Sequence, residues 1–160
     1  MKDSPRTELD MGLGHHKAGR LAKAEGIYRK ILSTNPKNAE ALHLMGLAAH
    51  HGGRNEQAAE FITNAISNDQ GNVKYYNNLG IVYLALDKNS NASKCFRDAI
   101  EIDPNSTNAY FNLGLIMAAR EDYEEALKLF RQAIILDPEF ADAHYNLSLA
   151  LTKCGYIEEV

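Results

Sequence analysis

Apolar residues recur along the chain with the three- and four-residue spacing of one helical face. In one stretch, Tyr110, Leu113 and Met117 fall on a single side of a helix. Stretches of this kind come in pairs, and short turns such as those at Gly19 and Gly53 separate the two members of a pair. The pattern therefore predicts an all-α chain built from antiparallel pairs of amphipathic helices.

A proline-containing dipeptide ends most helix pairs at a constant interval. Asp103-Pro104 and Asp137-Pro138 lie 34 residues apart, and Asn35-Pro36 lies two such intervals before the first of them. The end of the second unit falls at Asp69-Gln70, which lacks proline and is followed by Gly71, another residue that disfavours helix. Proline ends a helix because it cannot donate to the hydrogen-bond ladder. The period predicts one domain, 1–160, with repeats 5–38, 39–72, 73–106 and 107–140 and a partial repeat 141–160.

Small and large residues occupy fixed positions of this period. The eighth position holds Gly12, Gly46, Gly80, Gly114 and Ser148, the twentieth holds Ala24, Ala58, Ala92 and Ala126, and the twenty-fourth holds Tyr28, Ile62, Phe96 and Phe130. Glycine inside a helix costs about 1 kcal/mol relative to alanine, so its recurrence needs a compensating gain. We therefore expect close contacts between the two helices of each pair.

These residues resemble the tetratricopeptide repeat, and the resemblance covers nearly the whole chain. It implies an all-α, right-handed superhelical solenoid in which the first helix of each pair lines an inner, concave wall. It also implies a non-catalytic protein–protein interaction module that binds an extended peptide segment in the concave groove. Departures occur at Glu8 and His144, where a large apolar residue is usual, at His15, where tyrosine is usual, and at Gln70.

Asparagine occupies the sixth position of three successive units, as Asn78, Asn112 and Asn146, whereas the first two units carry Asp10 and Leu44 there. A side-chain amide both donates and accepts, so a row of amides can bracket the main chain of an extended peptide. The row resembles the asparagine ladder in the repeat region of O-linked N-acetylglucosamine transferases, which implies that it binds a peptide backbone. The alternative interpretation is that asparagine simply suits this turn of the repeat.

Neighbouring inward positions add aromatic, amide and charged groups to the predicted wall. The further candidate peptide-binding residues are Asn77, Asn108, Phe111, Tyr145 and Lys74. Another groove type in this family clamps a terminal carboxylate with paired lysines, an arginine and asparagines. Here the inward cations are scattered and partly offset by acidic residues, and they are Arg6, Lys17, Lys74 and Lys153. The pattern therefore argues against a clamp of that kind.

Two histidine pairs raise the question of a metal site. His16 and His50 share the twelfth position of neighbouring units and could face each other, His51 follows His50, and His15 falls on the helix-packing side. Imidazole binds transition metals, but no carboxylate or thiolate stands at ligand spacing. Phosphate-binding glycine loops and protease or esterase motifs are also lacking. We expect no metal, no cofactor and no catalytic site.

Composition and charge narrow the classes of partner. The 17 Lys and Arg against 21 Asp and Glu give a formal charge of −4, without a basic block that could neutralise a phosphate backbone. Apolar stretches fall far short of the roughly 20 residues that cross a bilayer. Cys95 and Cys154 are too few and too distant for a disulfide scaffold. We expect a cytoplasmic protein that binds protein or peptide, and neither nucleic acid nor membrane.

Two other interpretations of the function stay open. The second helix of the fifth unit should begin near residues 157–160, so the repeats could be the substrate-recruiting region of a larger enzyme, such as a glycosyltransferase or methyltransferase. Alternatively, solenoid ends that lack a polar cap would expose apolar surface and favour self-association, as in a self-assembling scaffold. The identity of the ligand cannot be derived from a groove that contacts main chain.

Overall fold

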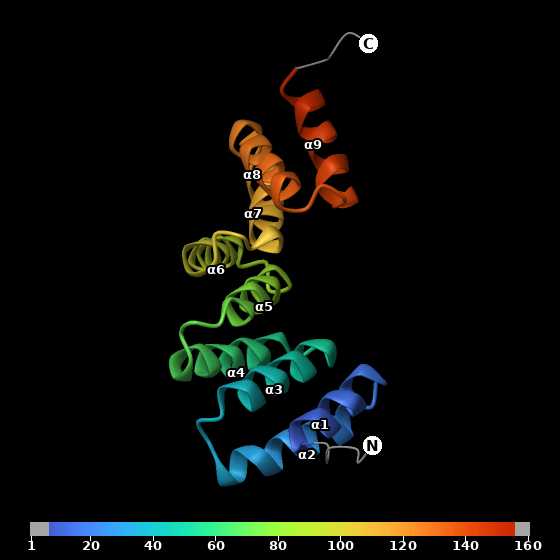
Figure 1. Ribbon diagram of the computed structural model, residues 1–160, viewed down its shortest axis with the longest axis vertical. Coiled ribbons are helices and arrows are strands. Elements are labelled where there is room, and N and C mark those ends of the chain that lie inside the picture. Colours follow the sequence, from blue (N-terminus) through green and yellow to red (C-terminus); the bar gives the residue numbers. More distant parts are fainter. Residues whose placement is uncertain (1–6, 156–160) are drawn as a thin grey trace, which may run out of the picture. The chain divides into compact units, whose positions relative to one another are not determined.

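The computed structural model describes residues 7–155, which form two compact units, residues 7–87 and residues 88–155 (Figure 1). The first unit contains α1 (Glu8–Lys17), α2 (Leu21–Thr34), α3 (Ala39–His51), α4 (Asn55–Asn68) and α5 (Val73–Leu84). The second unit contains α6 (Asn89–Ile102), α7 (Thr107–Ala119), α8 (Tyr123–Leu136) and α9 (Ala141–Lys153). No strand occurs in this part of the chain, so the predicted all-α helical solenoid of repeats is confirmed.

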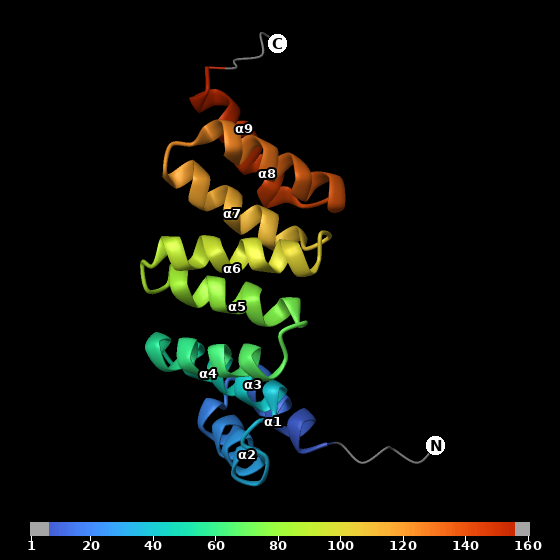
Figure 2. The same cartoon turned by 90° about the vertical axis from the view of Figure 1, so that its left-hand side faces the viewer.

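Each unit is built from helix pairs stacked on one another. Figure 1 and Figure 2 show α1 beside α2, α3 beside α4 and α7 beside α8, each pair antiparallel. First helices of successive pairs also contact each other, namely α1 with α3 and α3 with α5 in the first unit, and α7 with α9 in the second. These first helices carry the predicted site residues. Arg6 and residues 157–160, on which two expectations depend, lie outside the described residues.

The glycines at the eighth position allow a large side chain of the paired helix to approach the backbone. A Cβ atom added to Gly46 would lie 2.6 Å from Cγ1 of Ile62, and one added to Gly114 would lie 2.6 Å from Cε1 of Phe130. The side chains of Ile62 and Phe130 are both fully buried. The close contact expected from the sequence is therefore confirmed, and its partner is the residue at the twenty-fourth position of the same unit.

Aspartate side chains hold the turns that follow α4, α6 and α8, and two of these turns also contain proline. Asp103 Oδ1 accepts a hydrogen bond from the backbone N–H of Asn105 at 3.0 Å. Asp69 makes the same contact with the N–H of Gly71 at 3.3 Å, although this unit lacks the proline. Such side-chain contacts two residues ahead stabilise tight turns. The repeat spacing thus survives the loss of one proline.

The turn within each pair places one residue in the left-handed backbone region. The fifteenth position has a φ of 72° at Gly19, 76° at Gly53, 56° at Asp87, 62° at Glu121 and 76° at Gly155. Glycine adopts this conformation without strain because it has no Cβ, whereas an L-residue is disfavoured there by about 1–2 kcal/mol. The repeat therefore demands a left-handed residue at this point even where the sequence does not supply glycine.

Candidate functional site

In the first unit, α5 carries three of the predicted site residues. Lys74 is exposed, and Asn77 and Asn78 are half-buried. The side-chain Nδ2 of Asn78 donates a hydrogen bond to Nε2 of His43 on α3, at 2.7 Å. One N–H of the Asn78 amide is therefore engaged within the protein, and its second N–H and its Oδ1 acceptor are left for other partners.

His43 supports this asparagine and was missed by the sequence analysis. Its side chain is buried, and its ring packs against the ring of Tyr75 with centroids 4.6 Å apart. Burial, aided by the positive charge of Lys74, lowers the pKa of His43 to about 4, so its ring is neutral at pH 7. His43 occupies the fifth position of its unit. The repeat register could have identified His43 as a partner of Asn78, because the fifth position of one unit lies beside the sixth position of the next.

A cavity of about 440 Å³ lies next to this pair, between α3 and the start of α5. Its lining includes Glu40, Asp69 and Lys74, together with His43 and Tyr75. Two carboxylates therefore share the cavity with the one lysine. This mixture of charges suits a polar group of a ligand better than a bare carboxylate, since the two acidic residues would repel an anion.

In the second unit, α7 carries three predicted site residues in different surroundings. Asn108 is exposed and Asn112 is half-buried. The side-chain amide of Asn112 makes no hydrogen bond to another described residue. The ring of Phe111 packs against those of Phe140 and Phe130, with centroids 4.8 Å and 6.0 Å apart, and the side chain is half-buried. Phe111 thus serves internal packing as well as any ligand.

The last helix of the second unit, α9, presents large apolar side chains to solvent. Tyr145 is 70% exposed and Leu149, one turn later, is 47% exposed. Asn146 lies between them in the sequence and is half-buried. Its Nδ2 donates to the backbone carbonyl of Asp142 at 2.8 Å, so one N–H is used within its own helix. The amide oxygen and the second N–H of Asn146 are left for a ligand.

An apolar cavity of about 280 Å³ adjoins Asn146 between α7 and α9. Leu115 and Ala118 line it from α7, and Leu149 and Lys153 line it from α9. Asn112, on α7, is not part of this lining. The second unit thus brings Asn146 next to a small apolar recess, whereas Asn78 belongs to the first unit.

One histidine contact differs from the sequence-based expectation that His16 and His50 could face each other. His16 is the buried member of its pair, and its Nε2 lies 2.7 Å from Nδ1 of His51 rather than facing His50. His15 accepts a hydrogen bond from Nε of Arg20 at the turn. A helix has no strict alternation of inward and outward neighbours, so the residue after the expected one can take the packing position. Burial lowers the pKa of His16, with the charge of His51 adding to the effect.

The described residues were also considered as ligands of a metal ion and as parts of a membrane span. No group of three or more His, Cys, Asp and Glu side chains between residues 7 and 155 could hold a metal ion. None of the helices in the same part of the chain has the length and apolar character of a membrane span.

Four models of the tetratricopeptide repeat family match this chain. One, described as a tetratricopeptide repeat, matches residues 15–80, two others match residues 73–106 and 95–128, and a TPR repeat model matches residues 116–155. The matches follow one another without a gap from residue 15 to residue 155. The chain belongs to the tetratricopeptide repeat family.

Solved structures share this fold over most of the chain. MamA is 25% identical, with a TM-score of 0.83 over 91% of this chain and 85% of that chain. YrrB, described as a TPR protein with an unusual peptide-binding site, is 24% identical, with a TM-score of 0.78 over 94% of this chain and 78% of its own. The first TPR domain of Spaghetti, bound to an HSP90 peptide, is 23% identical, with a TM-score of 0.71 over 73% and 93%.

No curated protein sequence matches the chain significantly. The repeat fold is generally that of a protein-interaction module rather than a catalyst, and the family and its structural neighbours support that class of function for this chain.

Proposed function

We propose that the first-helix face of this protein binds an extended peptide segment through contacts with the peptide main chain. In this proposal Asn78, Asn112 and Asn146 bind backbone groups, and the side chains around them contact the ligand's own side chains. The observation that carries the proposal is the half-buried amide of Asn112, which keeps both its donor and its acceptor free of other described residues.

A free amide on this face has a physical reason to bind main chain. An N–H and a C=O of an extended peptide point outward on the same edge, and one asparagine can accept from the first and donate to the second. Asn78 and Asn146 each use one side-chain N–H internally, so each has its oxygen and one remaining N–H for a peptide. The three amides are therefore expected to contribute unequally, with Asn112 contributing most.

Apolar surface beside the amides supports a peptide ligand. Tyr145 and Leu149 expose large side chains one turn apart on α9, and the 280 Å³ cavity adjoins them. Burying apolar area is favourable by roughly 25 cal/mol per Å². A moderately apolar peptide would gain this contribution as well as the hydrogen bonds. The Spaghetti domain is bound to an HSP90 peptide and YrrB has an unusual peptide-binding site, so other proteins of this fold take peptides as ligands.

The experiment that tests this function begins with peptides selected on the native chain from a random linear library. The selected peptide is then resynthesised with single N-methyl groups along its backbone and, separately, with single alanine substitutions. Main-chain recognition predicts that N-methylation at the central bonds weakens binding about tenfold per lost hydrogen bond. If only the side-chain substitutions weaken binding, the backbone proposal is wrong.

A matched pair of variants tests whether the peptide binds to the first-helix face. Asn112→Ala combined with Asn146→Ala should abolish measurable binding of the selected peptide. Asn91→Ala changes an exposed asparagine on the second helix α6 of the same unit and should leave binding unchanged. Equal loss in both variants, or in neither, would remove the first-helix face as the site.

A further inference from the structure

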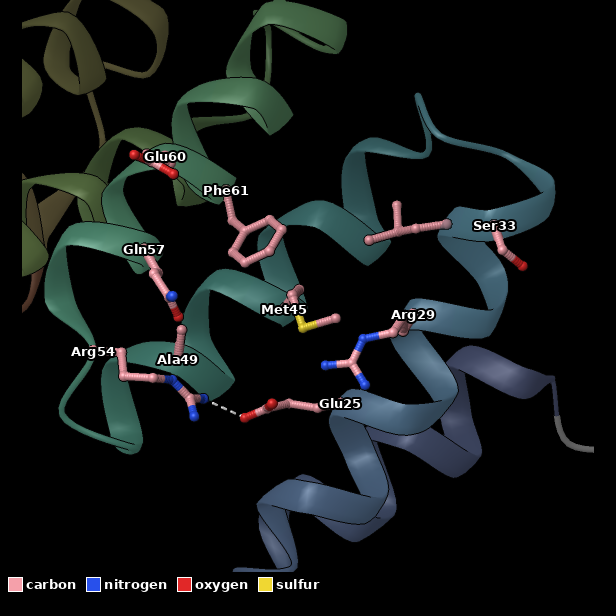
Figure 3. A pocket seen from close by; sticks show the side chains of 10 residues that line it. Glu25, Arg29, Ser33, Met45, Ala49, Arg54, Gln57, Glu60 and Phe61 are labelled. Carbon is pink, nitrogen blue, oxygen red and sulfur yellow. Dashed lines mark hydrogen bonds and ion pairs between the residues drawn. The ribbon is translucent and has the colours of Figure 1, made fainter.

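A cavity lies between the second helices α2 and α4 of the first unit, lined by none of the predicted site residues. Its volume is about 720 Å³, which is within the range of pockets that bind ligands, roughly 300–1,000 Å³. Figure 3 shows Met45 and Ala49 of α3 between the two helices, with Phe61 of α4 directed into the same space. We call this space the α2–α4 groove, with Leu32, Met45, Ala49 and Phe61 as its apolar lining.

A small residue, Ala49, lines the groove at a position where another repeat has a larger side chain. Ala49 holds the eleventh position of its unit, and the same position of the fourth unit is Met117, whose side chain is buried in the second unit. A larger side chain at position 49 is therefore expected to occupy part of the groove.

Two charged side chains of the groove, Arg29 and Glu60, form no ion pair with another described residue. Glu25 and Arg54 form an ion pair across it, and the Glu25 side chain is only 16% exposed. Arg29, on α2, makes no ion pair or hydrogen bond with another described residue, and Figure 3 shows its guanidinium directed over the groove beside Met45. Glu60 lies at the opposite edge, on α4.

We propose that the α2–α4 groove is a second protein-docking site, which binds a partner segment that carries an acidic side chain beside a large apolar side chain. The apolar side chain inserts against Leu32, Met45 and Phe61, and the carboxylate pairs with Arg29. Arginine favours carboxylates because its guanidinium donates two parallel hydrogen bonds. Glu25 does not compete for Arg29, because Arg54 already neutralises it.

This second site is independent of the asparagine face. It lies between the second helices, whereas Asn78, Asn112 and Asn146 lie on the first helices. The protein would then bind two segments at once and bring together the two proteins that carry them. Failure of the asparagine proposal leaves this one intact, and the reverse also holds.

The chain has four methionines, which provide a direct readout of the groove. With 13C-labelled methionine methyl groups, Met45 reports on the groove, while the buried Met117 of the second unit serves as an internal reference. The probe is the peptide acetyl-Ser-Glu-Leu-Phe-Ser-amide. Two matched peptides replace its Glu by Lys, or its Leu and Phe by Ser.

The acidic, apolar peptide is expected to shift the Met45 resonance saturably and to leave Met117 unchanged. The lysine peptide should bind about tenfold more weakly, as one lost charge-assisted contact predicts, and the serine peptide should not bind. An unmoved Met45 resonance at millimolar peptide overturns the proposal, and so does equal affinity for the acidic and basic peptides. A Met45 shift that follows protein concentration alone would assign the groove to a second copy and would also overturn it.

Two variants complete the test. Ala49→Met fills the groove with the residue that the fourth unit already tolerates, and it should abolish the shift of Met45. Arg29→Glu changes an exposed side chain, so folding is preserved, and it should reverse the preference towards the lysine peptide. Asn112→Ala should leave all of these affinities unchanged. If Arg29→Glu binds both peptides as the native protein does, the proposed carboxylate contact does not exist.

Discussion

The amide of Asn78 donates to Nε2 of His43 across 2.7 Å and so links the first helices of two successive repeats, α5 and α3. His43 accepts this hydrogen bond only while its ring is neutral. Burial and the nearby Lys74 keep it neutral by lowering the pKa of His43 to about 4. Glu40 and Asp69, the acidic residues of the adjoining cavity, do not outweigh these effects.

This pKa predicts how stability changes with pH. An unfolded histidine titrates near 6.5, so between about pH 6.5 and pH 4 the unfolded state binds a proton that the native state does not. The free energy of unfolding should therefore fall as the pH falls through this window, by about 3 kcal/mol at most. The measurement is urea unfolding from pH 7 to pH 4.5, for the native protein and for His43→Leu. The variant should lose stability less steeply with acid, and identical slopes would contradict the assigned pKa.

The close contact of Gly114 with Phe130 predicts an unusual response to alanine. Alanine raises helix propensity, but at Gly114 its Cβ would lie 2.6 Å from the Phe130 ring, and overpacking of this kind costs about 1–3 kcal/mol. Gly114→Ala should therefore destabilise the protein. Gly26→Ala, in α2, has nothing within 4 Å and should stabilise it by up to about 1 kcal/mol. Denaturation midpoints that move in the same direction for both variants would refute the packing argument.

The left-handed backbone at Glu121 predicts a stabilising glycine. With a φ of 62°, Glu121→Gly should relieve strain worth more than the entropy that glycine loses, for a net gain of up to about 1 kcal/mol. Glu124→Gly places the same substitution in the first turn of α8 and should cost about 1 kcal/mol. Thermal unfolding of the two variants decides the point, because a loss of stability in both would mean that the turn bears no strain.

The two thiols should differ in reactivity. Cys95 is buried, and burial raises its pKa to about 12, so it carries almost no thiolate at pH 8. Cys154 is only partly buried, at the end of α9. Brief treatment with iodoacetamide, followed by peptide mass spectrometry, should find Cys154 alkylated and Cys95 protected until denaturant is added. Equal rates in the native protein would show that Cys95 is accessible.

The repeat and its helices could be derived from the sequence because they depend on local rules. Proline spacing, the glycines of the eighth position and three- or four-residue apolar spacing each act within one helix pair. The same rules do not specify which side chain of a pair faces a neighbouring repeat. That is why His16 pairs with His51 and not with His50. Glutamate itself carries no signal for the left-handed turn at Glu121, and only the repeat register, with Gly19 and Gly53 at the same position, points to it.

The candidate site was predictable in its positions but not in its chemistry. The asparagine period located Asn78, Asn112 and Asn146, yet it treated the three amides as equivalent. Their contacts distinguish them, because the partners are a histidine of the preceding repeat and a carbonyl of the same helix. The α2–α4 groove was not predicted, because the residues that line it come from three different helices, α2, α3 and α4.

Peptide binding by the asparagine face depends most on Asn112, which is half-buried and whose side-chain amide has no hydrogen-bond partner among the described residues. The decisive measurement is therefore the dissociation constant of a library-selected peptide for Asn112→Ala and for the native protein, by isothermal titration calorimetry. Removal of a free amide should leave the free energy of unfolding nearly unchanged and weaken binding about tenfold, or about 1.4 kcal/mol. An unchanged dissociation constant in a folded Asn112→Ala protein would contradict peptide binding by the asparagine face.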